Sequence, residues 1–381
     1  MAWTPYQKIL ALLMVVTGSI NTLATKWADR LSSINSAGEL AKFNHPFLQA
    51  CGMFLGELSC LIVFKISLCA ERRKKEGGKQ NIGSNKFNPI IFLLPALCDM
   101  TATSIMYVGL NLTYASSFQM LRGAVIVFTG LLSVAFLERR LKVYEWVGIF
   151  IVILGLVCVG ASDIFSPSSE DSFGANSIIT GDLLIVMAQI IVATQMVVEE
   201  KFVTKHSVPA LLGVGWEGLF GFVILSILLV PMYYIKAGKS IFSNPGGRME
   251  DALDGFVQLS NSWQVTLAFT GTIVSIAFFN FAGLSVTKEM SATTRMVLDS
   301  VRTFVVWVFS LALKWQKFHY LQLIGFIVLF IGMCLYNDVI IRPLYQMIRE
   351  KSDKSREHEP LIRNSDEESS GPVARSSSIN A

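Results

Sequence analysis

Residues 143–161 read VYEWVGIFIVILGLVCVGA, and Glu145 is the single charged residue among them. An α-helix rises 1.5 Å per residue, so a stretch of this length extends close to 30 Å, the thickness of the hydrocarbon core of a bilayer. Hydrocarbon offers the backbone no hydrogen bonds, and only helices and closed barrels satisfy every backbone group within it. The stretch therefore predicts a membrane-spanning helix.

The same apolar character recurs along the chain. Ten stretches are long and apolar enough to span a bilayer, at residues 7–26, 46–70, 88–110, 115–137, 143–161, 179–199, 208–235, 264–285, 291–313 and 318–341. A secretory signal peptide is the alternative for Met1 to Ala24, although its basic n-region is weak. The pattern predicts an all-α polytopic membrane protein with ten transmembrane helices.

The overall composition excludes an ordinary soluble protein. Of the 381 residues, 52% are hydrophobic and 16% are charged, whereas a soluble domain is about 25% charged. The 32 Lys and Arg residues and the 28 Asp and Glu residues leave a net charge of +4. A protein that binds nucleic acid needs a strongly basic surface, so we expect no nucleic-acid partner.

The cysteines and histidines carry no recognisable chemistry. The six cysteines fall inside apolar stretches without a C-x-x-C pair, and the four histidines form no H-E-x-x-H motif. Nucleophile-elbow and P-loop patterns are also missing from the sequence. We therefore expect no metal site, no cofactor and no enzymatic activity.

The ten spans divide into two halves of five at the acidic, Ser-rich stretch 162–176. We predict a first five-helix repeat at residues 1–161, a non-cytosolic linker loop at 162–178, a second five-helix repeat at 179–341 and a disordered cytosolic tail at 342–381. Because each half has an odd number of spans, the two repeats must be inverted across the membrane. A shift of 177 residues places identical residues together, namely Ala115/Ala292, Leu121/Leu298, Ser133/Ser310, Ala135/Ala312, Gly148/Gly325 and Gly155/Gly332.

The basic residues predict the orientation of the bundle. If the N-terminus is cytosolic, 20 of the Lys and Arg residues fall on the cytosolic side and 8 on the opposite side. Cytosolic loops carry the excess of basic residues in membrane proteins. We therefore predict that both termini are cytosolic.

Several motifs resemble a known family of carriers. The run Leu141-x-x-x-Glu145-Trp146-x-Gly148 with Gly155 resembles the half-ending signature of the drug/metabolite transporter superfamily, which includes the nucleotide-sugar carriers. Three longer runs look like solute carrier family 35, subfamily F: HPFLQA at 45–50, ASSFQMLRG at 115–123 and SATTRMVLDS at 291–300. The resemblance implies a ten-helix carrier and, by analogy with the family, nucleotide-sugar transport.

Eight ionisable residues lie within the predicted spans. They are four acids and four bases: Glu57, Asp99, Glu217, Asp299, Lys65, Arg122, Arg295 and Arg302. Because a charge in hydrocarbon costs at least about 2.5 kcal/mol, each should face a partner or a water-filled cavity. Lys65 lies close to a span end, where its long side chain can reach the interface, and the same route is open to Arg295.

The spacing of the charges in the ninth span places them on one face. Arg295, Asp299 and Arg302 follow an i, i+4, i+7 pattern, which confines them to about 60° of a helix. The 177-residue shift superposes Arg122 of the fourth span on Asp299. This predicts a charge pair or a substrate clamp between the halves; a structural ion pair between helices is the alternative. The candidate binding or gating residues are Arg122, Asp299, Arg302, Gln119, Glu217, Asp99 and Glu57.

The charges leave two substrate classes open. Arg122 and Arg302 can hold a phosphate or carboxylate through paired hydrogen bonds, which favours an organic anion such as a nucleotide conjugate. If the arginines are already paired, the acids can bind an organic cation or relay protons. We predict a secondary transporter that works by alternating access. A non-transporting membrane scaffold is the alternative class, favoured if the charges are fully paired in a closed core.

The tail carries a candidate sorting signal. Glu357, Leu361 and Ile362 fit the acidic dileucine pattern that clathrin adaptors read, which predicts an endosomal or lysosomal membrane. The Golgi, the plasma membrane and the mitochondrion remain open as locations. The predicted partners are a small-molecule substrate, the lipid bilayer, a clathrin adaptor at the tail and a second copy of the chain in a homodimer.

Overall fold

The computed structural model describes residues 3–74, 88–110, 112, 113, 118, 120–138, 140–165, 175–206, 208–236, 247–313 and 320–336. The chain forms two compact units, Met1–Asn337 and Asp338–Ala381, and all the described residues belong to the first. The predicted sorting signal in the tail therefore lies outside the described residues.

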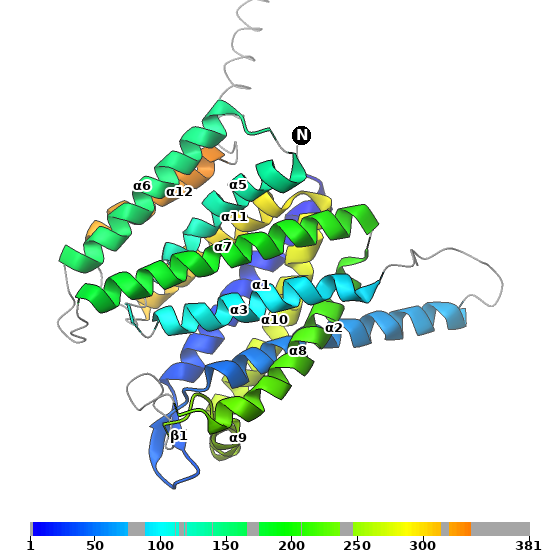
Figure 1. The fold of residues 1–381 in the computed structure, drawn as a ribbon. Helices are drawn as coiled ribbons and strands as arrows, with labels where there is room; N and C mark the ends of the chain where they lie inside the picture. Colours follow the sequence, from blue (N-terminus) through cyan, green and yellow to red (C-terminus); the bar gives the residue numbers. More distant parts are fainter. Residues whose placement is uncertain are drawn as a thin grey trace, which may run out of the picture. The chain divides into compact units, whose positions relative to one another are not determined.

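Helices make up most of this unit (Figure 1). The α-helices are α1 (Pro5–Arg30), α2 (Pro46–Lys74), α3 (Leu93–Leu110), α5 (Val125–Leu137), α6 (Val143–Phe165), α7 (Ala175–His206), α8 (Ala210–Tyr234), α9 (Ala252–Asn261), α10 (Trp263–Glu289), α11 (Ala292–Ala312) and α12 (Tyr320–Tyr336). Two 3₁₀ turns, η1 (Pro89–Phe92) and η2 (Arg122–Ala124), precede α3 and α5. Two strands, β1 (Ser32–Ile34) and β2 (Leu40–Lys42), form an antiparallel hairpin.

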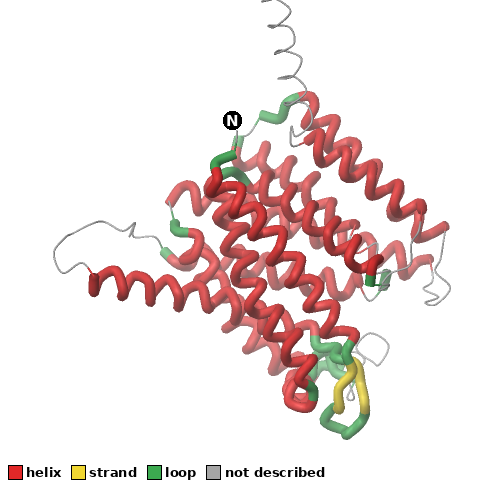
Figure 2. The backbone as a smooth tube through the Cα atoms, turned by 180° about the vertical axis from the view of Figure 1, so that it is seen from behind, coloured by secondary structure: helices red, strands yellow, loops and turns green. Residues whose placement is uncertain are grey.

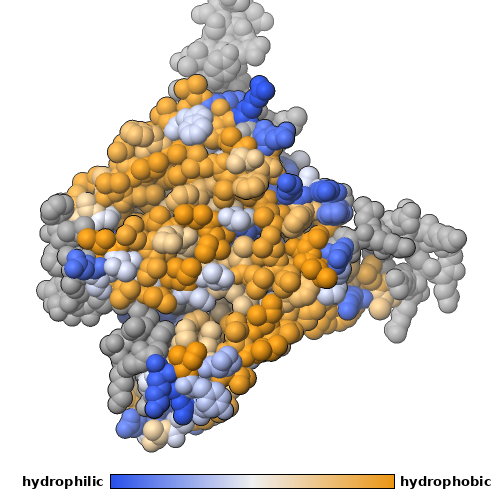
Figure 3. Space-filling model, in the orientation of Figure 1, coloured by the Kyte–Doolittle hydropathy of each residue, from blue (hydrophilic) through white to orange (hydrophobic). Residues whose placement is uncertain are grey.

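Among the described helices, seven are long and apolar enough to cross a membrane: α1, α2, η1 with α3, α6, α7, α8 and α10. Two apolar helices are shorter, at Arg122–Leu137 and Leu323–Tyr336. The ninth predicted span is the helix α11, which carries Arg295, Asp299 and Arg302. Apolar side chains cover the helices on the face that Figure 3 shows. The chain is therefore an α-helical, multi-pass membrane protein.

The helices α1, α2, α6, α7 and α10 each extend at least four residues beyond their predicted ends, and α1 and α7 matter most for the charges. The helix α1 starts from a capping box of Thr4 and Gln7 and continues to Arg30, four residues past the predicted end. The helix α7 continues to His206, seven residues past its predicted end. Lys205 and His206 occupy its last turn, where a positive charge interacts favourably with the helix dipole. Charged residues that lie beyond these predicted span ends are thereby part of the helical bundle.

The β-hairpin and α9 lie together at one end of the helices and were not predicted from the sequence (Figures 1 and 2). The hairpin follows α1 directly, and β1 contacts α9. Between them, Ser33 donates to the carbonyl of Gln258 at 2.7 Å, and Asp254 accepts from the backbone of Ser36 at 2.6 Å. We call this part the hairpin end of the bundle.

The most extensive helix contacts join the predicted first half to the predicted second half. They pair α6 with α12, α1 with α10, α2 with α8 and α3 with α7. The helix α5 contacts both α7 and α11. The two predicted repeats are therefore packed into each other and do not form separate bundles.

Glycines allow α6 and α12 to approach closely. A Cβ atom added to Gly148 would lie 2.9 Å from the carbonyl oxygen of Gly332, and one added to Gly155 would lie 3.0 Å from that of Gly325. Early residues of one helix thus meet late residues of the other, so the helices are antiparallel. These are the four glycines that the 177-residue shift superposes.

Gly155→Ala is expected to destabilise the protein by about 1–3 kcal/mol, because the new methyl group meets the backbone of Leu329 and Gly325 and the helices must separate. Gly160→Ala in the same helix is the matched control, since a Cβ there meets no atom within 4 Å. The stability of both variants is compared through their midpoints of thermal unfolding in detergent. Equal midpoints would contradict the close packing of α6 on α12.

Candidate functional site

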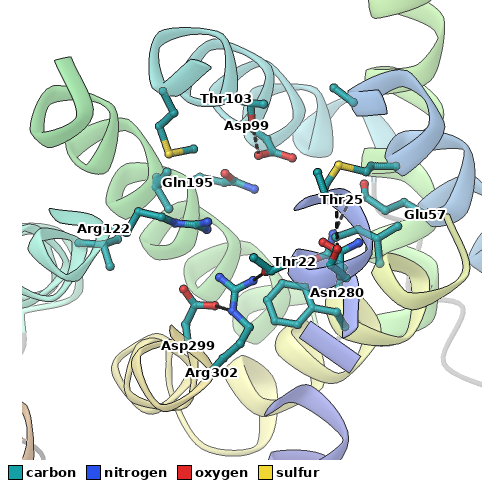
Figure 4. Close-up of a pocket in the computed structure, with 18 of the residues that line it drawn as sticks. Thr22, Thr25, Glu57, Asp99, Thr103, Arg122, Gln195, Asn280, Asp299 and Arg302 are labelled. Carbon is teal, nitrogen blue, oxygen red and sulfur yellow. Dashed lines mark hydrogen bonds and ion pairs between the residues drawn. The ribbon is translucent and has the colours of Figure 1, made fainter. Parts of the chain in front are cut away.

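A cavity of about 380 Å³ lies inside the helical bundle. Side chains from α1, α2, α3, α5, α7, α8, α10 and α11 line it, together with the 3₁₀ turn η2 (Figure 4). Its lining runs from Asp29 and Arg30 in the last turn of α1, which leads into the hairpin end, to Arg295 in the first turn of α11. The cavity therefore extends along much of the bundle.

The structure brings most of the predicted site residues together. Six of them line this cavity: Glu57, Asp99, Arg122, Glu217, Asp299 and Arg302. The seventh, Gln119, lies outside the described residues. Lys65 is exposed on α2, as its predicted reach to the interface requires. Among the described residues, no group of three or more His, Cys, Asp or Glu side chains is placed to hold a metal ion.

A buried polar network lies near one end of the cavity. Glu199 of α7 forms an ion pair with Arg295 of α11, and the two residues are 1% and 7% exposed. Gln195 donates to Glu199 at 2.9 Å and to Glu217 of α8 at 2.8 Å. The network ties α7 to α8 and α11. Breaking such a buried pair from one side is costly because it leaves a charge without a partner.

The carboxyl of Glu57 lies on the α2 side of the cavity. It accepts a hydrogen bond from the amide of Asn280 on α10. Asp99 on α3 accepts from Thr103 one turn away, at 3.4 Å. Each carboxyl thus has a polar neighbour, and both point toward the space that Figure 4 shows at the centre.

The charged face of α11 is organised within the helix itself. Arg302 Nε lies 2.8 Å from Asp299 Oδ1, and Arg302 Nη1 donates to Thr22 of α1 at 3.1 Å. The guanidinium also lies over the ring of Phe279, 4.9 Å from its centroid. The structure thus pairs Asp299 with Arg302 of its own helix, and a pair or clamp between Arg122 and Asp299 stays a prediction.

Arg122 enters the cavity from the turn η2, at the start of the fourth predicted span. Its guanidinium carbon lies 5.9 Å from the ring centroid of Phe118. In Figure 4 the side chain points into the space between the helices, on a different side from Asp99 and Glu57. Arg122 is thus placed to contact a solute in the cavity.

The prediction that Arg295 could reach the interface is wrong, because the side chain is buried in the pair with Glu199. Sequence reasoning missed Glu199 because the sixth span was expected to end there. The basic residues Lys205 and His206, which are typical of the last turn of a helix, were the signal that the helix continues.

The charges at the end of α1 were missed for the same reason. Lys26 donates to Ser310 of α11 at 3.2 Å, and Asp29 accepts from Gln49 of α2 at 2.7 Å. Both residues and Arg30 line the cavity. The first span was expected to end at Lys26, which left Asp29 and Arg30 in a loop.

Apolar helices around an internal, charge-lined cavity define a multi-pass membrane protein with a built polar site. The family model described as "Solute carrier family 35" matches residues 10–241, and the chain belongs to this family. It is 60% identical to solute carrier family 35 member F6 of Homo sapiens, over 90% of this chain and 92% of the relative. Membership indicates a transporter rather than an enzyme.

Two more distant proteins extend the comparison. The chain is 23% identical to CMP-sialic acid transporter 1 of Arabidopsis thaliana, over 82% of this chain and 86% of the relative. A solved crystal structure superposes with a TM-score of 0.56 at 11% identity, over 89% of this chain and 99% of that chain. At that identity the superposition shows a shared fold alone.

Proposed function

We propose that the protein is a secondary-active solute transporter that works by alternating access. The observation that carries the proposal is the cavity, which helices of both predicted halves line with charged side chains. Because a charge buried among membrane helices is costly, a set of them around an open space is best explained by a polar solute that passes through. This arrangement favours transport over the alternative, a scaffold with fully paired charges in a closed core.

We also propose the ten-helix arrangement in two inverted repeats, residues 1–161 and 179–341. A two-fold axis in the membrane plane would exchange the pair α1–α10 with the pair α7–α3, and would map α2–α8 and α6–α12 onto themselves. The same operation exchanges the contact of Gly148 and Gly332 with that of Gly325 and Gly155. These helix pairs and glycine contacts support the proposal.

The proposed substrate is an organic ion, and the proposed membrane is endosomal or lysosomal. Arg122 and Arg302 in the cavity favour an anion such as a nucleotide sugar, in line with the CMP-sialic acid transporter among the relatives. The distribution of basic residues supports cytosolic termini, with the hairpin end facing the lumen. The signal at Glu357, Leu361 and Ile362 supports the location and contact with a clathrin adaptor. A proton-coupled carrier of organic cations is the second candidate, which the buried acids favour.

Uptake into liposomes tests the transport function. Purified protein is reconstituted and supplied with pooled nucleotide conjugates, organic anions and organic cations, with and without a pH gradient. Arg122→Ala and Asp299→Ala should each lower uptake by about 10–100-fold, the equivalent of one lost charge-assisted hydrogen bond. Lys65→Ala is the control, since Lys65 is exposed outside the cavity. Absence of uptake by the folded, unaltered protein would favour the scaffold.

A further inference from the structure

The charges that line the cavity are unevenly distributed, and we propose that the solute carries both a positive and a negative group. The inference rests on the proposed function, because it names the substrate class of the same cavity. An acidic pole comprises Glu57, Asp99, Glu199 and Glu217, with Arg295 as the base among them. A basic pole comprises Lys26, Arg30, Arg122 and Arg302, with Asp29 and Asp299 as the acids among them.

The four carboxyls of the acidic pole act on one another although they come from four helices. The charge of Glu57 on α2 interacts with those of Asp99 and Glu199, and the charge of Glu217 interacts with all three. They share the guanidinium of Arg295, which forms its ion pair with Glu199. The pole therefore has a formal excess of negative charge. An ammonium group in this part of the cavity would be attracted to the carboxyls and would stabilise their charged form.

The basic pole has the opposite excess. The charge of Lys26 interacts with those of Arg30 and Arg122, while Asp29 is the acid near it. Arg302 is paired with Asp299. Four bases thus accompany two acids. A carboxylate or a phosphate would balance this excess, and guanidinium groups bind such anions through two parallel hydrogen bonds.

The two poles occupy different parts of the cavity. Lys26 and Arg30 belong to the last two turns of α1, at the hairpin end, whereas Glu199 lies toward the end of α7 and Arg295 in the first turn of α11. In Figure 4, Asp99 and Glu57 lie on the upper and right sides of the central space. Arg122 lies on its left side and Arg302 on its lower side. A solute in this space meets both poles together.

Apolar side chains line the cavity together with the charged groups. Met53, Met106, Phe118 and Phe279 line the same cavity. They favour a solute whose two charged groups are joined by an apolar spacer and whose size fits about 380 Å³. A solute with a single charge would balance one pole and leave the excess at the other.

Binding of a series of small molecules with increasing chain length tests this inference without a transport measurement. The probes are 4-aminobutanoate, 6-aminohexanoate and 8-aminooctanoate, with the alkylamine and the alkanoate of each length as single-charge controls. Binding to the full-length protein in nanodiscs is measured from the rise in the unfolding midpoint with ligand concentration. At the best spacer length, the amino acid should bind roughly tenfold or more tightly than either control. The inference would be overturned if a single-charge control bound equally well, or if none of the three amino acids bound to the folded protein.

Two variants should separate the poles. Asp99→Asn is expected to weaken the amino acid and the amine but not the alkanoate, and Arg122→Gln is expected to weaken the amino acid and the alkanoate but not the amine. Glu57→Gln replaces Asp99→Asn if that variant does not fold, and Lys65→Gln outside the cavity is the matched control. Equal weakening of all three ligands by one variant contradicts separate poles.

The binding and uptake experiments separate the inference about the substrate from the proposed transport function. Binding of the amino acids without their uptake into liposomes contradicts the transporter and leaves the inference in place. Uptake of singly charged solutes without any preference for the amino acids contradicts the inference and leaves the transporter in place.

Discussion

Glu199→Ala is expected to lower the free energy of unfolding by about 3–5 kcal/mol, the range found when one partner of a buried ion pair is removed. The variant leaves the Arg295 guanidinium, which is 7% exposed, without its carboxylate. It also removes an acceptor of Gln195, which bridges to Glu217. The loss should appear as a fall of at least about 5 °C in the unfolding midpoint of the purified protein in detergent.

Glu289→Ala is the control for this prediction, because Glu289 is exposed at the end of α10. The double variant Glu199→Gln with Arg295→Met should recover much of the stability, since it removes both charges and leaves neither one buried alone. The ion pair would have no structural role if Glu199→Ala unfolded at the same temperature as Glu289→Ala. A double variant as unstable as the sum of its parts would exclude the coupling.

Glu250→Ala is expected to lower the free energy of unfolding by about 2–4 kcal/mol. The substitution removes a helix cap and leaves buried hydrogen-bond donors without this acceptor. Glu250 is 1% exposed at the hairpin end and accepts from the backbone of Phe47 at 2.9 Å and of Leu48 at 3.3 Å, in the first turn of α2. His45 Nδ1 lies 2.8 Å from its other oxygen. Without this carboxyl, the backbone donors of Phe47 and Leu48 lose the acceptor that Glu250 provides.

The size-matched variant Glu250→Gln retains one acceptor oxygen and should lose less stability than Glu250→Ala. Glu39→Ala on the neighbouring hairpin should have no measurable effect, because Glu39 is exposed. The midpoints of thermal unfolding should rank the three variants in stability, with Glu39→Ala highest, Glu250→Gln next and Glu250→Ala lowest. If Glu250→Gln and Glu250→Ala were equally unstable, the charge of Glu250 and its contact with His45 would matter more than the cap.

Prediction of cavity-lining charges from the sequence was possible where a charge lay deep inside an apolar stretch. Asp99 and Glu217 fall well within their predicted spans, and both line the cavity. It failed at the span ends, where hydropathy does not show whether a helix continues into polar sequence. Glu199 falls at the end of the predicted span 179–199 and Asp29 lies beyond the predicted span 7–26, although each lies inside a helix that continues further.

The glycines show what a sequence match can and cannot specify. The 177-residue shift pairs Gly148 with Gly325 and Gly155 with Gly332 as equivalent positions. In the structure Gly148 meets Gly332 and Gly155 meets Gly325. Equivalence by symmetry and contact in space are different relations, and only the second requires the antiparallel packing of α6 on α12.

By itself, the sequence determined that this is a helical multi-pass membrane protein of solute carrier family 35. Whether a segment is stable in hydrocarbon depends on the apolar character of about 20 consecutive residues and on hydrogen bonds within the same helix. Each span can therefore be predicted from its own sequence. Only the tertiary structure decided which charges share the cavity. Glu199 and Arg295 are 96 residues apart, and Glu57 and Asn280 are 223 apart. Their contacts depend on how each helix rotates and packs against distant helices, which no local pattern records.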